Sequence, residues 1–262
     1  MTASSLTIDT DDRGVATITL NRAVIHNAFD NLMIAELLQA LEIVETDQRV
    51  RLLVLRAKGD SFSAGADLNW MRRMADYDHR QNRDDAMELA RLMKNLNQLN
   101  KPVIAVVQGA SFGGGVGLVA CCDIAIGSSK ALFCLSEVRL GLIPAVISPY
   151  VIAAIGERAA RRYFLSAERF NAEQALSLGL LHDVVDPEAL DYRVEKMVEA
   201  LLLGGPKAQS EAKQLIREVG NRLGDERVIK HTAECIAKIR ASSEGREGLN
   251  AFLQKRAPNW KS

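Results

Sequence analysis

The sequence predicts an α/β fold in which a stack of βαβ-type turns is followed by a tail of helices. Two observations carry this prediction. In the first part of the chain, short runs that are apolar, or that alternate apolar and polar residues, are separated by stretches with helical periodicity. From about residue 153 onward the pattern is almost wholly helical. We therefore expect strands joined by crossovers, with the later helices docked on this core or on a neighbouring subunit.

The first elements are a hairpin and a βαβ unit. The runs "LTIDT" and "VATITL" lie on either side of a turn at residues 12–14, and their alternation is typical of a β-hairpin. After "HNAFD", apolar residues recur at helical spacing, and "VRLLVLRA" then follows as a strand. The apolar residues of this helix are Leu32, Met33, Leu37, Leu38, Leu41 and Val44.

A second helix and three more strands come next. A polar helical stretch over residues 84–99 stops before Lys101-Pro102, because proline does not continue a helix. We expect strands at "VIAVVQG", "CDIAIGS" and "ALFC". The helical tail consists of "ERAARRYFLSA", "NAEQALSLGLL", "DYRVEKMVEALLLG", "PKAQSEAKQLIREVG" and "RVIKHTAECIAKIRAS".

Composition excludes several classes of protein. The chain has 262 residues and 48% hydrophobic content, which is enough for a buried core. Its 33 basic and 33 acidic residues are interspersed, so it lacks the charge pattern of a nucleic-acid-binding protein. The N-terminus has no basic start before an apolar run, and no apolar run is long enough to span a membrane. We therefore expect a cytoplasmic protein without a membrane partner.

The cysteines predict no metal site. Cys121, Cys122, Cys134 and Cys235 form no CxxC pair, and no histidine is arranged with them at metal-ligand spacing. We expect reduced thiols in the core. The histidines are scattered along the chain, and none is expected to act as a base.

Two loops rich in small residues stand out. Gly113-Gly114-Gly115 lies between the strand "VIAVVQG" and the helical run "GLVACCDIA", and "SFSAGADLNWM" also follows a strand and precedes a helix. The amide N–H groups at the start of a helix can bind an anion or a developing oxyanion. Glycine there can equally serve a tight turn or close helix packing. A dinucleotide fingerprint fits less well, and no Lys-Ser/Thr follows as in a P-loop.

Together with "GASFGGGVGL", "SEVRLGLIPAVIS" and "FLQKRAPNW", the second loop resembles the crotonase, or enoyl-CoA hydratase/isomerase, superfamily over nearly the whole chain. The resemblance implies a crotonase-like ββα-superhelix, a spiral of βαβ turns, over residues 1–200 and a C-terminal helical trimerisation region over residues 201–262. It also implies a homotrimer or homohexamer, an acyl-CoA thioester as substrate, and no cofactor beyond the coenzyme A of that substrate.

The same resemblance assigns site residues. The backbone amides of Ala66 and Gly114 would hold the thioester oxygen, whose charge grows as the thioester enolises. Ala64, Ala66, Asp67 and Leu68 would line the region of the adenine and pantetheine groups. For Asp67, an N-cap of the following helix is at least as good an explanation.

The sequence departs from the family's hydratases at one position. Where they carry a first glutamate, this chain has Gly117, whereas the second glutamate corresponds to Glu137 in "LSEVRLGLIP". A hydratase conveniently uses two carboxylates, whereas a double-bond isomerase can move one proton with a single carboxylate. The single glutamate therefore favours an isomerase.

The residues around the motifs, however, resemble those of the family branch of methylglutaconyl-CoA or carboxygeranoyl-CoA hydratases. We therefore expect a hydratase of a glutaconyl-type enoyl-CoA, in which Gly117 leaves room for a branched acyl group. The substrate carboxylate or an ordered water would then take over part of the missing glutamate's role. A Δ3-Δ2 enoyl-CoA isomerase and a non-catalytic acyl-CoA-binding protein remain as alternatives.

Overall fold

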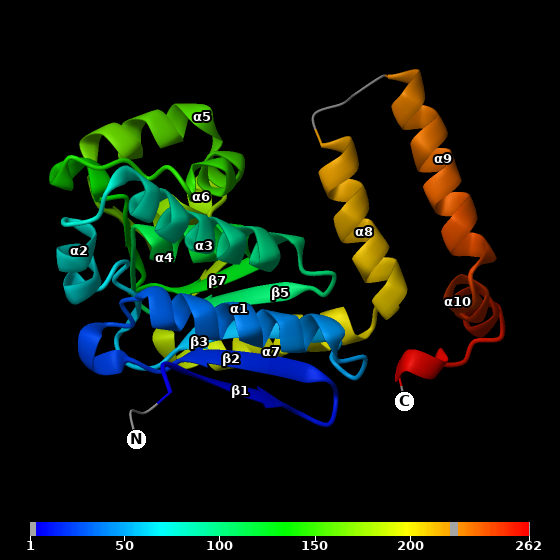
Figure 1. The fold of residues 1–262 in the computed structure, drawn as a ribbon. Helices are drawn as coiled ribbons and strands as arrows, with labels where there is room; N and C mark the ends of the chain where they lie inside the picture. The colour runs from blue at the N-terminus through cyan, green and yellow to red at the C-terminus, as the bar shows by residue number, and fades with distance from the viewer. Residues whose placement is uncertain (1–3, 221–224, 262) are drawn as a thin grey trace.

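A computed structural model describes residues 4–220 and 225–261 (Figure 1). Its strands form two sheets within these residues. The larger sheet has the order β1-β2-β3-β5-β7-β10, and the smaller sheet has the order β4-β6-β8-β9. The larger sheet consists of β1 (Leu6–Thr10), β2 (Val15–Leu20), β3 (Leu52–Ala57), β5 (Val103–Val107), β7 (Ile124–Ser128) and β10 (Asp183–Val185). The smaller sheet consists of β4 (Ser61–Ser63), β6 (Ala110–Phe112), β8 (Leu132–Cys134) and β9 (Phe170–Asn171).

The chain winds as a spiral that gives one strand to each sheet per turn. β3 leads into β4, β5 into β6, and β7 into β8. The strands β2, β3, β5, β7 and β10 pair in parallel, as do β4, β6 and β8. The two antiparallel pairs are the predicted hairpin β1–β2 and the pair β8–β9. This confirms the predicted fold of βαβ-type turns, and it places the carboxyl ends of β4, β6 and β8 side by side.

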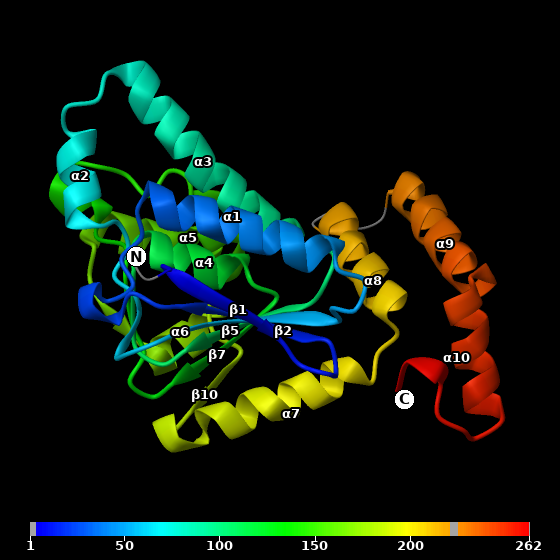
Figure 2. The ribbon, with the colours of Figure 1, turned by 60° about the horizontal axis from the view of Figure 1, so that its bottom comes forward.

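Helices cover both faces of the larger sheet. The helices of the α/β core are α1 (Asn31–Thr46), α2 (Leu68–Met74), α3 (His79–Gln98), α4 (Gly114–Cys121), α5 (Ser148–Ser166), α6 (Ala172–Leu178) and α7 (Leu190–Leu202). Figure 2 shows α1 and α3 on one side of the sheet and α7 on the other. Alternate residues of β3 point to the two sides: Leu53 and Leu55 join the main core with α1, whereas Leu52 and Val54 pack with α7.

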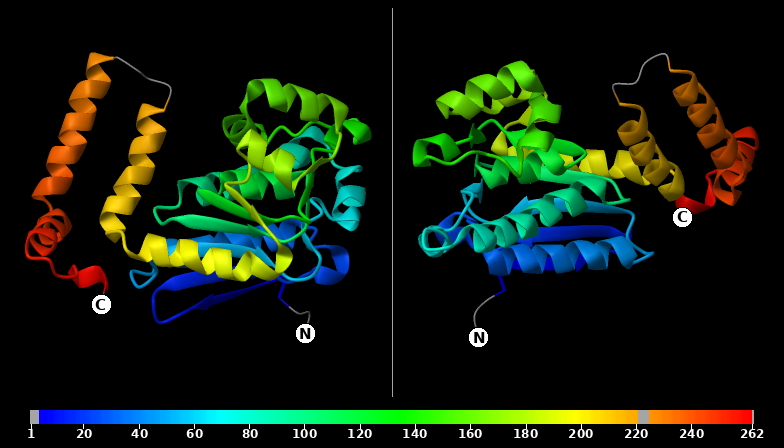
Figure 3. Two further views of the ribbon diagram at one scale, coloured as in Figure 1. Left: turned by 180° about the vertical axis from the view of Figure 1, so that it is seen from behind. Right: turned by 45° about the horizontal axis from the view of Figure 1, so that its top comes forward.

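The remaining helices lie apart from the sheets. They are α8 (Pro206–Val219), α9 (Glu226–Ala241) and α10 (Ser243–Leu253), and short 3-10 turns occur at Ala23–Ile25, Glu137–Leu140, Pro187–Ala189 and Asn259–Lys261. Both views in Figure 3 show α8, α9 and α10 to one side of the α/β core. The end of the chain returns to this core, because Arg51 donates a hydrogen bond to the backbone oxygen of Trp260 over 3.0 Å.

Several sequence predictions need correction. The polar helix predicted over residues 84–99 is α3, and it begins at His79, five positions before the predicted start. It begins there because Asp78 and Gln81 form a capping box. Leu32 was expected on the apolar face of the first helix, but its side chain is 56% exposed. The very short strands β4, β6, β9 and β10 were not predicted, nor was α10.

None of the described helices combines the length and the apolar character that a membrane crossing requires.

Candidate active site

The two small-residue loops meet at the carboxyl ends of β4 and β6. These strands are parallel neighbours, with Ser61 opposite Ala110 and Ser63 opposite Ser111. A Cβ atom placed on Gly65 would lie 2.9 Å from the backbone oxygen of Phe112 and 3.8 Å from the nitrogen of Gly114. The loops are therefore in contact, as the family resemblance implied.

The first loop is held by two backbone hydrogen bonds to Phe29. The amide of Phe29 donates to the oxygen of Gly65 over 2.8 Å, and the amide of Asp67 donates to the oxygen of Phe29 over 3.0 Å. Gly65 has φ +84°, a left-handed conformation that favours glycine. Between these two bonds, the amide of Ala66 has no hydrogen-bond acceptor among the described residues. It is thus available as a donor to a ligand.

The second loop presents the amide of Gly114. Gly113 donates its own N–H to the oxygen of Cys134 over 2.8 Å, and α4 begins at the next residue. The first amides of a helix lack partners within the helix. Within the described part of the chain, none of the hydrogen bonds uses the Gly114 amide. Both residues assigned to an oxyanion site therefore carry open donors on adjoining loops.

The glycines also permit close packing. A Cβ atom on Gly114 would lie 2.3 Å from Cζ of Phe29, and one on Gly115 would lie 2.8 Å from the backbone oxygen of Ser63. The two explanations for the triplet are therefore compatible, because the packing of these glycines holds the loops together. Phe29 was not predicted as a residue of this region, although it is bonded to one loop and packed against the other.

Asp67 caps α2. Its Oδ1 atom accepts hydrogen bonds from the amides of Asn69 and Trp70 over 2.8 and 3.0 Å. The guanidinium of Arg22 lies 3.0 Å from the carboxylate of Asp30 and 3.8 Å from that of Asp67. The N-cap explanation of Asp67 is thus confirmed, and Arg22 joins the starts of α1 and α2 electrostatically.

Ala64 and Leu68, the other residues assigned to the coenzyme A region, have exposed side chains on this loop. They are therefore accessible to a ligand.

Glu137 lies beside the second loop. A Cβ atom on Gly113 would be 3.1 Å from Oε1 of Glu137. Its Oε2 atom is buried and has no hydrogen-bond partner among the described residues. Burial raises the pKa of this carboxyl group above its ordinary value of 4.5. Such a group suits proton exchange, since it holds a proton at higher pH than a solvated glutamate.

The space beside Gly117 is already filled. A Cβ atom on Gly117 would lie 2.2 Å from Cγ2 and 2.8 Å from Cβ of Ile147, which is buried before α5. The expectation that Gly117 leaves room for a branched acyl group is therefore wrong: Ile147 occupies that room. Neither Ile147 nor its contact with Gly117 was visible in the sequence, because 30 residues separate them.

The cysteine prediction is also only partly correct. Cys121 and Cys134 are buried, but Cys235 is a half-buried residue of α9. Its Sγ atom lies 3.5 Å from Nε2 of His231. The statement that no histidine accompanies a cysteine at ligand spacing is wrong here, because these residues are four positions apart on one helix.

The chain is similar to known proteins over nearly its whole length. The sequence model described as enoyl-CoA hydratase/isomerase matches residues 10–262. A crystal structure of an enoyl-CoA hydratase from Shewanella pealeana is 51% identical with a TM-score of 0.95, and the match covers 98% of this chain and 96% of that one. The 2,3-dehydroadipyl-CoA hydratase of Escherichia coli K12 is 32% identical over 94% of this chain and 95% of its own length. The trans-2-decenoyl-[acyl-carrier-protein] isomerase of Streptococcus mutans is 30% identical over 95% of each chain.

Proposed function

Because the chain belongs to the enoyl-CoA hydratase/isomerase family, we propose that it is a hydratase that adds water to the double bond of a glutaconyl-type enoyl-CoA thioester. The observation that carries this proposal is the position of Glu137. Its half-buried carboxyl group lies against Gly113, next to the open amide of Gly114. The proposed acid/base thus contacts the residue that precedes the proposed oxyanion donor.

The proposed chemistry uses the amides of Ala66 and Gly114 to hold the thioester oxygen. The carboxylate of Glu137 takes a proton from water as the water oxygen bonds to C3 of the enoyl group. The electrons of the double bond then move toward the thioester, and the resulting enolate oxygen is stabilised by the two N–H groups. The protonated Glu137 finally delivers its proton to C2, so that H and OH have been added and the carboxylate is regenerated.

Two points support a glutaconyl-type substrate. The sequence around the motifs is similar to that of methylglutaconyl-CoA and carboxygeranoyl-CoA hydratases. The Escherichia coli relative is named a 2,3-dehydroadipyl-CoA hydratase. Dehydroadipyl and glutaconyl groups both end in a carboxylate. With glycine at position 117, that carboxylate or an ordered water would help to orient the attacking water.

A Δ3-Δ2 enoyl-CoA isomerase is the second candidate. The observation in its favour is that position 117 is glycine, so Glu137 has no second carboxylate at that position of the motif, and the Streptococcus mutans relative is named an isomerase. In that reaction Glu137 would remove a proton from C2 of a 3-enoyl group and return it to C4. A non-catalytic acyl-CoA-binding protein is disfavoured, because a binder has no use for a buried carboxyl group with an unpaired oxygen.

Product analysis in water enriched in ¹⁸O distinguishes the candidates. The purified protein is incubated with 3-methylglutaconyl-CoA, crotonyl-CoA and a 3-enoyl-CoA, and products are identified by mass and by loss of enoyl absorbance. We expect ¹⁸O in the product of 3-methylglutaconyl-CoA, formed ~10²- to 10⁴-fold more slowly with Glu137→Gln. Double-bond movement without ¹⁸O would establish the isomerase. Tight binding of all three thioesters without turnover would overturn both enzymatic proposals.

A further inference from the structure

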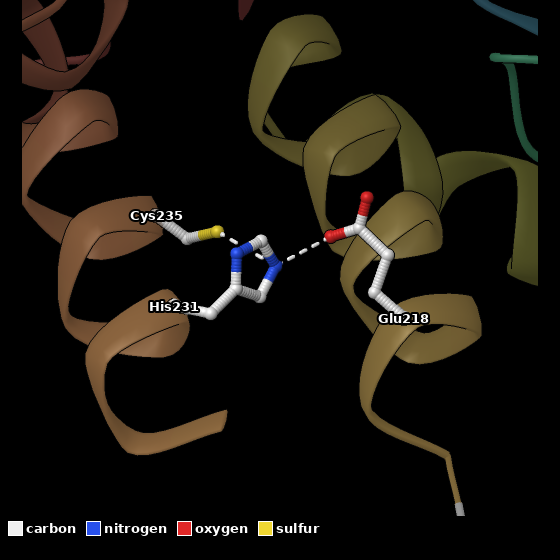
Figure 4. Close-up of side chains that lie close together, drawn as sticks. All are labelled: Glu218, His231 and Cys235. Atoms are coloured by element: carbon white, nitrogen blue, oxygen red, sulfur yellow. Dashed lines mark hydrogen bonds and ion pairs between the residues drawn. The ribbon is translucent and has the colours of Figure 1, made fainter. Parts of the chain in front are cut away.

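A cluster of three potential metal ligands joins α8 to α9, away from the candidate active site. Glu218 lies in the last turn of α8, and His231 and Cys235 lie four residues apart on α9. The Nε2 atom of His231 is 2.6 Å from Oε2 of Glu218 and 3.5 Å from Sγ of Cys235. Figure 4 shows the three side chains pointing toward one another from the two helices.

The arrangement does not fit a nucleophile with its base. In a Cys-His-carboxylate relay, one ring nitrogen faces the thiol and the other is oriented by the carboxylate. Here the same nitrogen of His231 contacts both Glu218 and Cys235. Three donor atoms that converge on one point, all within 4.8 Å of one another, are instead what a bound cation requires.

We propose that Glu218, His231 and Cys235 bind a zinc ion, with water as its fourth ligand. Zinc prefers tetrahedral sets of nitrogen, sulfur and oxygen donors at ~2.0–2.3 Å, which places neighbouring donors ~3.3–3.7 Å apart. The separation of Sγ and Nε2 already lies in that range. Glu218 and His231 need to separate by less than ~1 Å, a small movement for a side chain as long as glutamate. A thiolate and a carboxylate would also neutralise the charge of the dication.

The surroundings support this assignment. The side-chain amide of Gln214 donates a hydrogen bond to the other carboxylate oxygen of Glu218, Oε1, over 2.7 Å. This bond fixes the orientation of the carboxylate. Two cations near the cluster have carboxylate partners of their own: Lys238 lies 3.3 Å from Glu211, and Arg227 lies 3.1 Å from Asp225. A surface cavity of about 210 Å³, bordered by all three ligands, gives an ion and its water access to the cluster. Bound zinc would fasten α9 to α8.

Titration of the full-length chain tests the site. After treatment with a chelator, the protein is titrated with ZnCl₂ by calorimetry and with CoCl₂ by absorbance. We expect one ion per chain and a thiolate-to-cobalt charge-transfer band. Loss of a residue that only orients a metal ligand costs ~10- to 100-fold in metal affinity. Loss of a direct ligand should cost at least as much, so Glu218→Gln, His231→Asn and Cys235→Ser should each weaken zinc binding at least about 100-fold.

Matched controls are Glu234→Gln, which borders the same cavity, and His79→Asn, a remote histidine at the start of α3. Both should bind zinc as the wild type does. A second readout uses the unaltered chain: zinc should slow alkylation of Cys235, measured by peptide mass. The absence of a cobalt–thiolate band, zinc binding that survives Cys235→Ser, or alkylation unaffected by zinc would each overturn the proposal and leave Glu218 and His231 as an ordinary hydrogen-bonded pair.

Discussion

The carboxyl group of Glu137 packs against the backbone of Gly113, at a point where a single added methyl group would lie 3.1 Å from Oε1. The contact arises from strand order. β6 and β8 are parallel neighbours with Phe112 opposite Cys134, so the residues that follow each strand meet at the same edge. The spiral thereby brings the proposed acid/base Glu137 from one turn to the loop of the proposed oxyanion donor Gly114 from another.

We expect Glu137→Gln to lower turnover ~10²- to 10⁴-fold, because the variant keeps the shape of the side chain but loses the proton-exchanging carboxyl group. The Kd for the acyl-CoA should change little, since the thioester oxygen is held by backbone amides. Single-turnover kinetics and calorimetric binding measure the two quantities separately. If affinity is lost while turnover of bound substrate is retained, Glu137 has a structural role.

Glu137 also predicts a pH dependence of stability. Burial raises the pKa of this carboxyl group in the folded chain above the ordinary 4.5, so the folded state binds more protons than the unfolded state between these two values. Its stabilising contribution is complete below pH 4.5 and is lost as the pH rises through the raised pKa. Denaturant unfolding from pH 4 to 8 should therefore show Glu137→Gln gaining stability relative to wild type across this window. A constant difference between the two proteins would contradict the burial argument.

Gly65→Ala should damage the oxyanion site more than it damages the fold. Alanine at φ +84° is strained, and its Cβ atom would lie 2.9 Å from the oxygen of Phe112, so the loop that carries the Ala66 amide must move. Loss of one oxyanion donor costs ~3 kcal/mol, or about 10²-fold in kcat/KM.

Gly156→Ala is the matched control, because Gly156 has φ +75° and open space where its Cβ atom would lie. With ψ 156° Gly156 lies in a backbone region that is essentially restricted to glycine, so the variant should lose ~1–3 kcal/mol of stability from the backbone alone and keep a nearly unchanged kcat/KM. Equal effects of the two variants on kcat/KM would show that the Ala66 amide is not needed.

Local patterns explain which parts of this structure could be predicted. The hairpin, α1 and β3 were visible because alternation and helical periodicity extend over five or more residues. Strands such as β9, with only two residues, have no measurable period. The loops of Gly65 and Gly114 were recognised because glycines between a strand and a helix signal a close backbone approach.

Contacts between distant segments could not be predicted in the same way. Phe29 reaches both loops, and Ile147 fills the space beside Gly117, but no periodicity relates these residues. The pair of His231 and Cys235 is different, since its spacing of four residues on a helical stretch was readable. What the sequence lacked was the approach of Glu218 from a second helix.

The contact between Gly117 and Ile147 changes what a restored glutamate should do. Gly117→Glu alone brings a Cβ atom to within 2.2 Å of Ile147, and overpacking of this kind costs ~1–3 kcal/mol before the burial of a charge is counted. Alanine at position 147 would not relieve it, because the Cβ atom of Ile147 is itself 2.8 Å away.

We expect the double variant Gly117→Glu with Ile147→Gly to regain stability over Gly117→Glu and to hydrate crotonyl-CoA faster than wild type, because a second carboxylate can position water. Denaturation curves and rates on crotonyl-CoA measure both effects, with Ile147→Gly alone as the control. A double variant that is folded and no faster than Ile147→Gly would show that position 117 does not face the reacting atoms.

The final prediction concerns assembly as a homotrimer or homohexamer, which the family resemblance implies. Ile229 and Ile236 lie seven residues apart on α9 and are 60% and 47% exposed, so they form an apolar stripe that the described chain leaves partly exposed. Removing the tail from Arg227 onward would delete this stripe together with Val228 and Ile239, and should abolish the oligomer.

Truncation also removes Trp260 and its bond to Arg51, so a finer variant is needed. Ile229→Glu with Ile236→Glu keeps the tail and places charge on the stripe, whereas Lys230→Glu changes the charge of the same helix without altering its apolar face. Light scattering should report a monomer for the double variant and an unchanged oligomer for Lys230→Glu, because only the former requires charge to be buried against a neighbouring subunit. An intact trimer in the double variant would place the contact between subunits on another surface.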